Sequence, residues 1–260
     1  MRPRFKLRHY RVSAHGQRPT RNAGRGSIHV SNAQATPVSG SLASVHGKFI
    51  TLDGVDGCGK STQAALLAQR LEDRGLTVRR TREPGGTPIG KALRHVLLDP
   101  EFKGMVPECE LLLFLADRAQ HLAEVIRPAL ERGEVVVCDR FHDATVAFQR
   151  YARGMDFTAV QPLLDQLVRP LPHVTFWLDA DVALADSRIV KREGDAAGYV
   201  DSQDLTRMEQ EPSAFHQRVR EGYRTIAAAE PGRVVQIDAA PAIQAVHEDI
   251  WARLTHRFRV

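Results

Sequence analysis

The feature that most restricts the fold of this chain is the run Gly54-Val-Asp-Gly-Cys-Gly-Lys-Ser61, which matches the pattern G-x-x-x-x-G-K-[ST] at every defined position. Average glycine usage makes this pattern arise by chance in roughly one chain of this length in a hundred. The run follows a short apolar strand predicted over residues 49–52 and precedes a helix predicted over residues 61–74. A strand, a glycine-rich turn and a helix in this order predict a loop that binds nucleotide phosphates.

The residue types in this loop suit the binding of oxyanions. Glycines let backbone N–H groups curl around a phosphate without side-chain collisions, and the next helix directs its positive N-terminal end at the same phosphate. The pattern assigns Lys60 to the β- and γ-phosphates and the Ser61 hydroxyl to Mg²⁺. The expected phosphate contacts are Gly54, Gly57, Gly59, Lys60, Ser61 and Thr62.

Strands and helices alternate from residue 48 onward. Four more strands are predicted over residues 76–80, 134–138, 174–178 and 234–237. Helices are predicted over residues 89–98, 108–132, 145–151, 160–168, 183–191, 212–230 and 242–257. Apolar strands that alternate with helices predict an α/β fold: a mostly parallel five-stranded sheet with helices on both faces. Ligands of such sheets bind beyond the carboxyl ends of the strands.

Positive charge is concentrated before this region. Residues 1–47 hold eight Lys and Arg residues and no acid, so residues 48–260 carry 36 − 8 = 28 basic residues against 31 acids. We therefore expect residues 1–47 to be a disordered basic extension and residues 48–260 to be the folded domain. The extension is open to three interpretations: a passive tail or misplaced start codon, an organelle-targeting segment, or a nucleic-acid-binding arm. For the folded domain we expect no nucleic acid as a partner.

Other features bear on the compartment. Cys58, Cys109 and Cys138 show neither a disulfide nor a metal-binding spacing, which suits a reducing compartment. The sequence also lacks a run of about 20 apolar residues of the kind that spans a membrane. We expect a cytoplasmic protein without a membrane partner, unless residues 1–47 direct it to an organelle.

Charged residues also follow the later strands. Arg82 precedes Pro-Gly-Gly, and Asp139, Asp179 and Asp238 each end a predicted strand. An Asp at such a strand end is the expected partner of Mg²⁺, and spacing alone does not choose among the three. Asp139 is favoured because Arg140 follows it and arginine suits phosphate contacts. Turn or helix-capping roles are the ordinary alternative for each Asp.

Taken together, five segments resemble the bacterial thymidylate kinase family, a group of P-loop nucleoside-monophosphate kinases. They are the phosphate loop with its strand (residues 49–63), the highly specific T-R-E-P-G-G-T stretch (81–90), a base-binding helix (110–118), the D-R-x-x-D-x-T-x-A-x-Q stretch (139–149) and the end of a lid (207–211). The resemblance covers about residues 48–258. It implies a P-loop NTPase fold with a lid over about residues 188–211, and a homodimer.

The family resemblance also implies roles for individual residues. In the acceptor site, Arg82 would hold the 5′-phosphate of dTMP, Asp56 would accept from the 3′-hydroxyl, and Phe148 would pack on the deoxyribose. The base would be stacked by Phe114 and read by Arg118, Thr145 and Gln149. The catalytic group would comprise Lys60, Arg140, Asp139 and the lid arginines Arg188 and Arg192, with Ser61 and Asp139 holding Mg²⁺.

Three departures from the family pattern stand out. Ala144 replaces a serine, and Phe148 replaces the usual tyrosine. The lid is the most divergent part, because residues 194–205 form a longer insertion and Thr206-Arg207 stands where the family has Asp-Arg.

The expected reaction is transfer of the γ-phosphoryl group of Mg·ATP to dTMP, which gives dTDP and ADP for dTTP synthesis. The alternatives are a kinase of another nucleoside monophosphate and a non-catalytic nucleotide-binding regulator.

Overall fold

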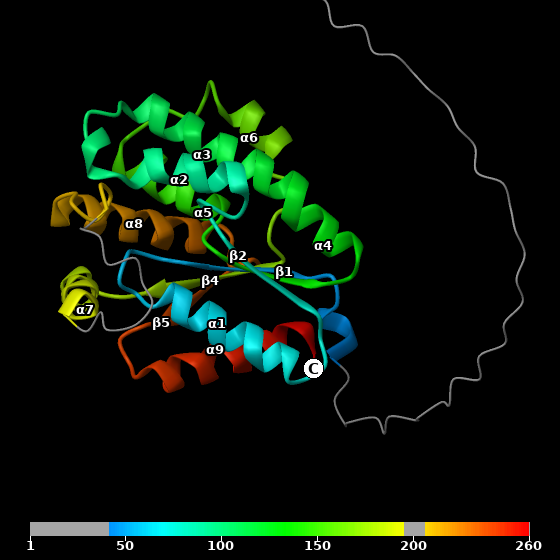
Figure 1. Cartoon of the computed structure of the whole chain (residues 1–260). Coiled ribbons are helices and arrows are strands. Elements are labelled where there is room, and N and C mark those ends of the chain that lie inside the picture. The colour runs from blue at the N-terminus through cyan, green and yellow to red at the C-terminus, as the bar shows by residue number, and fades with distance from the viewer. Residues whose placement is uncertain (1–41, 195–205, 260) are drawn as a thin grey trace, which may run out of the picture. The chain divides into compact units, whose positions relative to one another are not determined.

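The computed structural model describes residues 42–194 and 206–259. Its centre is a sheet of five parallel strands in the order β2-β3-β1-β4-β5 (Figure 1). The strands are β1 (Phe49–Asp53), β2 (Val78–Arg82), β3 (Val135–Asp139), β4 (Val174–Asp179) and β5 (Val234–Asp238). The α/β fold and the five predicted strands are thereby confirmed.

Strand β1 lies in the middle of the sheet and pairs with β3 on one side and β4 on the other. The chain therefore builds the sheet outward in both directions from β1, and the strand order reverses there. A reversal of this kind opens a crevice at the carboxyl end of the central strands. The phosphate loop follows β1 directly, so it lies at this crevice.

Helices cover both faces of the sheet. The α-helices are α1 (Lys60–Glu72), α2 (Pro88–Leu98), α3 (Pro107–His121), α4 (Arg127–Glu131), α5 (His142–Thr145), α6 (Gln161–Leu167), α7 (Val182–Gly194), α8 (Ser213–Ala229) and α9 (Ile243–Phe258). Helices α1 and α9 pack together on one face, and α3, α4 and α8 lie on the other (Figure 1). No helix in the described ranges is long and apolar enough to cross a membrane.

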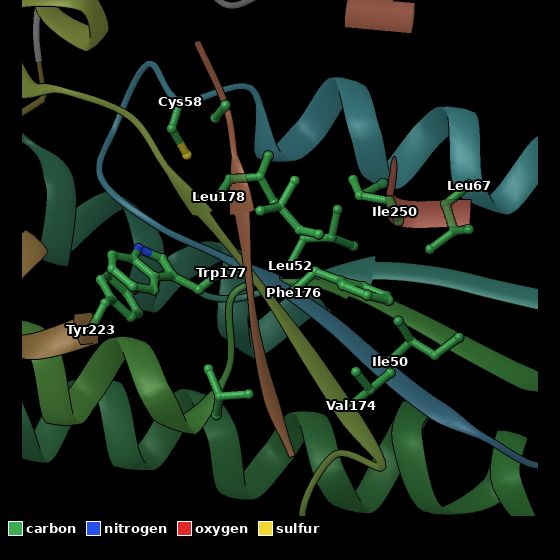
Figure 2. Packing of buried hydrophobic residues seen from close by; sticks show 14 of the residues in the cluster. Ile50, Leu52, Cys58, Leu67, Val174, Phe176, Trp177, Leu178, Tyr223 and Ile250 are labelled. Atoms are coloured by element: carbon green, nitrogen blue, oxygen red, sulfur yellow. The ribbon is translucent and has the colours of Figure 1, made fainter. Parts of the chain in front are cut away.

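The core lies between these layers. Leu52, Phe176 and Leu178 alternate along the strands toward α1 and α9, where Leu67 and Ile250 meet them (Figure 2). On the opposite face Trp177 stacks against Tyr223 of α8, with 6.2 Å between the ring centroids. Continuous burial of β1 and β3 follows from this two-sided cover, as the apolar sequences of these strands predicted.

Strand β2 differs from its prediction. It spans Val78–Arg82 rather than residues 76–80, and most of its side chains are exposed or half-buried. The register explains both points, because β2 is an edge strand that pairs only with β3, from Val78 beside Val135 to Arg82 beside Asp139. Its position brings Arg82 to the carboxyl edge of the sheet.

The predicted single helix over residues 108–132 is also different. The helical path begins at Pro107, but a π-helical segment, η3 (Leu122–Ile126), separates α3 from α4. Pro128 lies in the first turn of α4, where a missing backbone N–H costs no intrahelical bond. A second π-helical segment, η4 (Val146–Ala152), continues α5. Segment η4 contains Phe148 and Gln149, which are assigned to the acceptor site, and π-helical segments are common at functional sites.

The folded region begins before residue 48. A 3₁₀ helix, η1 (Leu42–Val45), precedes β1, and the side chain of Val45 is completely buried. The Ser44 hydroxyl donates to the carbonyl of Phe258 at 2.6 Å, and the Gly47 amide donates to the carbonyl of Gly133 at 3.0 Å. These contacts extend the described structure to residue 42, ahead of the boundary expected at residue 48. The rest of the expected extension, residues 1–41, lies outside the described residues.

Candidate functional site

The phosphate loop joins β1 to α1 and wraps the N-terminus of α1. Gly57 has a φ of +77°, and a Cβ atom there would collide with the backbone carbonyl of Ala185 in α7. Only glycine fits this contact, because a side chain would be strained by its backbone and blocked by its neighbour. The Lys60 ammonium, which is 6% exposed, donates to the Val55 carbonyl at 2.7 Å and lies 3.7 Å from Asp56. Its charge therefore stays inside the loop.

A serine and an aspartate from different elements meet beside this loop. The Ser61 hydroxyl donates to Asp139 Oδ2 at 2.5 Å, across 78 residues of sequence. Parallel pairing of β1 and β3 produces this meeting, because it aligns the carboxyl ends of the two strands. The other two candidate aspartates have different partners: Asp179 pairs with Arg220 at 2.5 Å, and Asp238 accepts from the Ala240 amide at 2.9 Å.

Arg140 connects the end of β3 to the phosphate loop. Its φ of 69° is unusual for a residue other than glycine, and its amide donates to the Leu52 carbonyl at 2.9 Å. The guanidinium donates to the Gly54 carbonyl at 2.9 Å and to Asp56 Oδ1 at 2.6 Å. Strained backbone of this kind is typical of functional sites. The turn therefore directs the cation at the phosphate loop.

The charges of Asp56 and Arg140 shift each other's pKa values. Burial alone would raise the pKa of Asp56, but Arg140 and Lys60 hold the pKa of that carboxyl well below its usual range. Burial would likewise lower the pKa of Arg140, but the charge of Asp56 raises it. Asp56 therefore stays ionised and can only accept hydrogen bonds, as its predicted contact with a sugar hydroxyl requires.

A second group of residues lies at the end of β2 and on α2. The side chain of Arg82 is exposed, and no hydrogen bond or ion pair joins it to other described residues. Arg94 of α2 donates to the Pro84 carbonyl at 2.9 Å. Burial lowers the pKa of Arg94, and the positive charge of Arg82 lowers it further. Two mutually repelling guanidinium groups form a suitable site for an anionic group such as an acceptor phosphate.

Of the residues predicted to read the base, Arg118 and Thr145 are in contact, and Gln149 has a different partner. Phe114 is half-buried on α3, one turn before Arg118. Arg118 is 2% exposed and donates to Thr145 Oγ1 at 2.8 Å. Gln149 is buried in η4, and its amide donates to Glu110 at 2.9 Å. Phe148 is 6% exposed, with the Arg140 guanidinium 4.9 Å above its ring.

Comparisons with known proteins identify the family of this chain. The family model for thymidylate kinase matches residues 52–250. This chain belongs to the thymidylate kinase family. It is 50% identical over 204 residues to the thymidylate kinase of Solidesulfovibrio magneticus, which covers 78% of this chain and 96% of that protein. It is 46% identical over 211 residues to the thymidylate kinase of Trichlorobacter lovleyi, with 79% of this chain and 98% of that protein covered.

A solved structure extends the comparison to the fold. The crystal structure of thymidylate kinase from Ehrlichia chaffeensis superposes with a TM-score of 0.63 and 32% sequence identity. The match covers 80% of this chain and 98% of that chain. The P-loop NTPase fold expected from the sequence is thereby confirmed.

The lid predicted for this thymidylate kinase family member is described only in part. Arg188 of α7 donates to the carbonyls of Ala239 and Ala240, at 2.9 and 3.1 Å, in the loop after β5. The side chain of Arg192 and residues 195–205 lie outside the described part of the chain. Arg207 is 5% exposed and pairs with Glu110 at 2.7 Å, so its charge is committed to the protein interior.

Sequence reasoning did not find several residues that support this site. Glu110 accepts from Gln149 and Arg153, which lie in and directly after η4, and from Arg207 in a separate segment. Tyr223 of α8 donates to Asp53 at 3.1 Å. No local pattern identifies such residues, because their partners are distant in sequence. Glu83 lies in the T-R-E-P-G-G-T stretch and Glu110 in the base-helix stretch, but the sequence pattern assigned no role to either residue.

Proposed function

We propose that this protein transfers the γ-phosphoryl group of ATP to dTMP, giving dTDP and ADP. The observation that carries the proposal is the position of Arg140 in a chain of the thymidylate kinase family. Arg140 follows Asp139, contacts Gly54 and Asp56 of the phosphate loop, and lies on the same sheet edge as Arg82. A cation between a donor-phosphate loop and an acceptor-phosphate site suits transfer between two phosphates.

The chemistry requires positioning more than proton transfer. A phosphate oxygen of dTMP is already a nucleophile, so no strong general base is needed. Lys60 and the backbone amides of the loop would hold the ATP phosphates, and Arg82 with Arg94 would hold the acceptor phosphate. Arg140 would neutralise the charge that develops between them. A lid arginine, Arg188 or Arg192, would complete the set on closure, which also excludes water.

Ser61 and Asp139 form a suitable pair for Mg²⁺. Both offer oxygen ligands, and their oxygens already lie 2.5 Å apart beside the phosphate loop. Magnesium commonly uses one or two protein oxygens, with phosphates and water as its other ligands. When bound, the ion would neutralise negative charge on the ATP phosphates.

Base selection would come from α3 and η4. Phe114 would stack on thymine, while Arg118, Thr145 and Gln149 would face its polar edge. Replacing Phe114 with Ala should therefore raise the KM for dTMP more than the KM for ATP, because stacking is lost only on the acceptor side.

We further propose that two copies of the chain associate through α2 and α3. Ile89 on α2 is 53% exposed, and Val106 and Leu112 at α3 are 57% and 55% exposed. The two helices pack against each other, so their exposed apolar side chains belong to one region of the surface. Sedimentation of the Leu112→Glu variant as a monomer, against a wild-type dimer, would support this assembly.

We place the reaction in the cytoplasm. Cys58, Cys109 and Cys138 are all free thiols, and Cys58 and Cys138 are buried. Free thiols suit a reducing compartment.

The test is ADP formation by the full chain with Mg·ATP and dTMP, dUMP, dCMP, dGMP, AMP or no acceptor. Strong dTMP-dependent turnover with little background hydrolysis is expected. Turnover with a different acceptor would retain the mechanism and overturn the base assignment. ATP binding without turnover on any acceptor would instead favour a non-catalytic regulator.

A further inference from the structure

Glu83 is a buried carboxylate at the junction of the acceptor loop and the base helix. It follows Arg82 at the end of β2, and its side chain is 3% exposed. Its backbone amide donates to the Asp139 carbonyl at 2.9 Å, so the same residue is fixed to the end of β3. The proposed mechanism gives Glu83 no direct contact with either substrate.

The two carboxylate oxygens of Glu83 contact two residues of α3. Arg118 Nε donates to Oε2 at 2.8 Å, and His121 Nδ1 lies 2.9 Å from Oε1. His121 is fully buried, and its Nε2 lies 2.6 Å from the Thr81 hydroxyl of β2. A continuous line of hydrogen bonds therefore runs from β2 through His121 and Glu83 to Arg118.

These bonds fix the guanidinium of Arg118 in one orientation. A guanidinium has five N–H donors. Three are used: Nε on Glu83, one on Nη1 for Thr145 Oγ1 and one on Nη2 for the Phe141 carbonyl at 2.9 Å. The remaining N–H groups, one on each terminal nitrogen, have no hydrogen-bond partner among the described residues. Arginine has several flexible bonds, so the direction of these donors depends on the other three contacts.

We propose that Glu83, held by His121, is a positioning residue that directs the free N–H groups of Arg118 at the exocyclic oxygen of the acceptor base. This inference rests on the proposed function. Thymine presents a carbonyl oxygen where cytosine presents an amino group, so a fixed pair of donors favours the first and repels the second. Glu83 therefore determines base discrimination without touching the nucleotide.

The decisive variant is Glu83→Gln, which keeps the shape but removes the negative charge and one acceptor. Loss of a charged hydrogen bond to Arg118 should raise the KM for dTMP about tenfold, with the KM for ATP changed less than about twofold. The ratio of kcat/KM for dTMP over dCMP should fall by about tenfold or more. The control is Glu108→Gln at an exposed position of α3, the helix that carries Arg118. This variant should leave the KM for dTMP and the ratio of kcat/KM values unchanged.

If Glu83→Gln does not fold, a pair of variants at His121 tests the same chain of hydrogen bonds. His121→Asn keeps an N–H donor near the position of Nδ1, and His121→Leu removes it. Discrimination between dTMP and dCMP should be retained in the first and reduced in the second. The proposal would be overturned if both His121 variants lost the same thermal stability while their discrimination between dTMP and dCMP stayed unchanged. It would also be overturned if Glu83→Gln lowered kcat but kept wild-type discrimination.

Calorimetric binding of dTMP and dCMP separates this inference from the proposed function. A wild-type chain that binds dTMP without turnover would contradict kinase activity, and the ratio of Kd values would then decide the role of Glu83. A wild-type chain with no preference for dTMP over dCMP would overturn the role of Glu83 directly.

Discussion

Charged residues of this protein form pairs whose two members come from different segments of the chain. Arg140 shows this best, because it is bonded to Asp56 and Gly54 of the phosphate loop and held by a strained backbone turn. The pairing keeps the guanidinium in place before any ligand binds. Arrangement of charge in advance lowers the cost of reorganisation during the reaction.

Replacing Arg140 with Ala should lower kcat by at least about 10³-fold, the range known for arginines that stabilise phosphoryl transfer. ATP binding, measured by calorimetry, should remain, because Lys60 and the loop amides are unchanged. Arg150→Ala is the control, since Arg150 is exposed and lies over the ring of Tyr151, away from the phosphate loop. Normal turnover of Arg140→Ala would exclude the proposed role.

Asp117 provides a test of pH dependence. Burial and the neighbouring carboxylate of Glu83 raise the pKa of Asp117 to about 6, and its Oδ2 has no hydrogen-bond partner among the described atoms. Because this pKa is raised on folding, ionisation of Asp117 costs stability as the pH rises from about 4 to about 6.

Asp117→Asn removes this cost and keeps an acceptor for the Gly85 amide. At pH 7 to 8 the free energy of unfolding of the variant should therefore exceed that of the wild type by at least about 1 kcal/mol. This difference should shrink as the pH falls toward about 4. Denaturant unfolding at pH 4, 6 and 8 measures it. A difference that does not change with pH would contradict the raised pKa.

At the scale of elements, Glu110 of α3 joins the η4 region to the segment around Arg207. It is 1% exposed on α3 and accepts from Gln149 of η4, from Arg153 and from Arg207 at the end of the lid. The hydrogen bonds from Arg153 and Gln149 lower the pKa of Glu110 although burial opposes them. Helix α3 and the segment around Arg207 therefore share one buried anchor.

Glu110→Ala should lower the free energy of unfolding by about 3–5 kcal/mol, because it leaves the buried guanidinium of Arg207 without Glu110 as its counter-charge, whereas Arg153 keeps its ion pair with Glu211. Glu108→Ala on the exposed side of the same helix should change it by less than about 0.5 kcal/mol. Urea unfolding of both variants gives the comparison. A loss below about 1 kcal/mol for Glu110→Ala would mean that the arginines find other partners.

At the scale of the whole molecule, the N-terminal limit of the folded region can be located by truncation. A chain of residues 42–260 should match the full chain in thermal stability and dTMP turnover, because it keeps every described contact. A chain of residues 48–260 lacks Val45, whose burial contributes about 1.5–3 kcal/mol. Its melting temperature should fall accordingly. Equal stability of the two truncated chains would show that η1 contributes nothing.

Local sequence determined the parts of this protein whose physics is local. The phosphate loop depends on glycines that permit its backbone, and the apolar runs of β1 and β3 predicted strands covered on both faces. The motif around Asp139 and Arg140 also indicated the family correctly. Edge strand β2 was placed two residues early, because its limits follow from pairing with β3 and not from its own polar sequence.

Only the tertiary structure decided which charges meet. Sequence spacing could not choose among Asp139, Asp179 and Asp238, whereas strand order places Asp139 beside Ser61 and Asp179 beside Arg220. The partners of Glu83 and Glu110 likewise come from distant segments, so no local pattern predicts them. A backbone conformation is set by neighbouring residues, but a buried ion pair depends on how the whole chain folds.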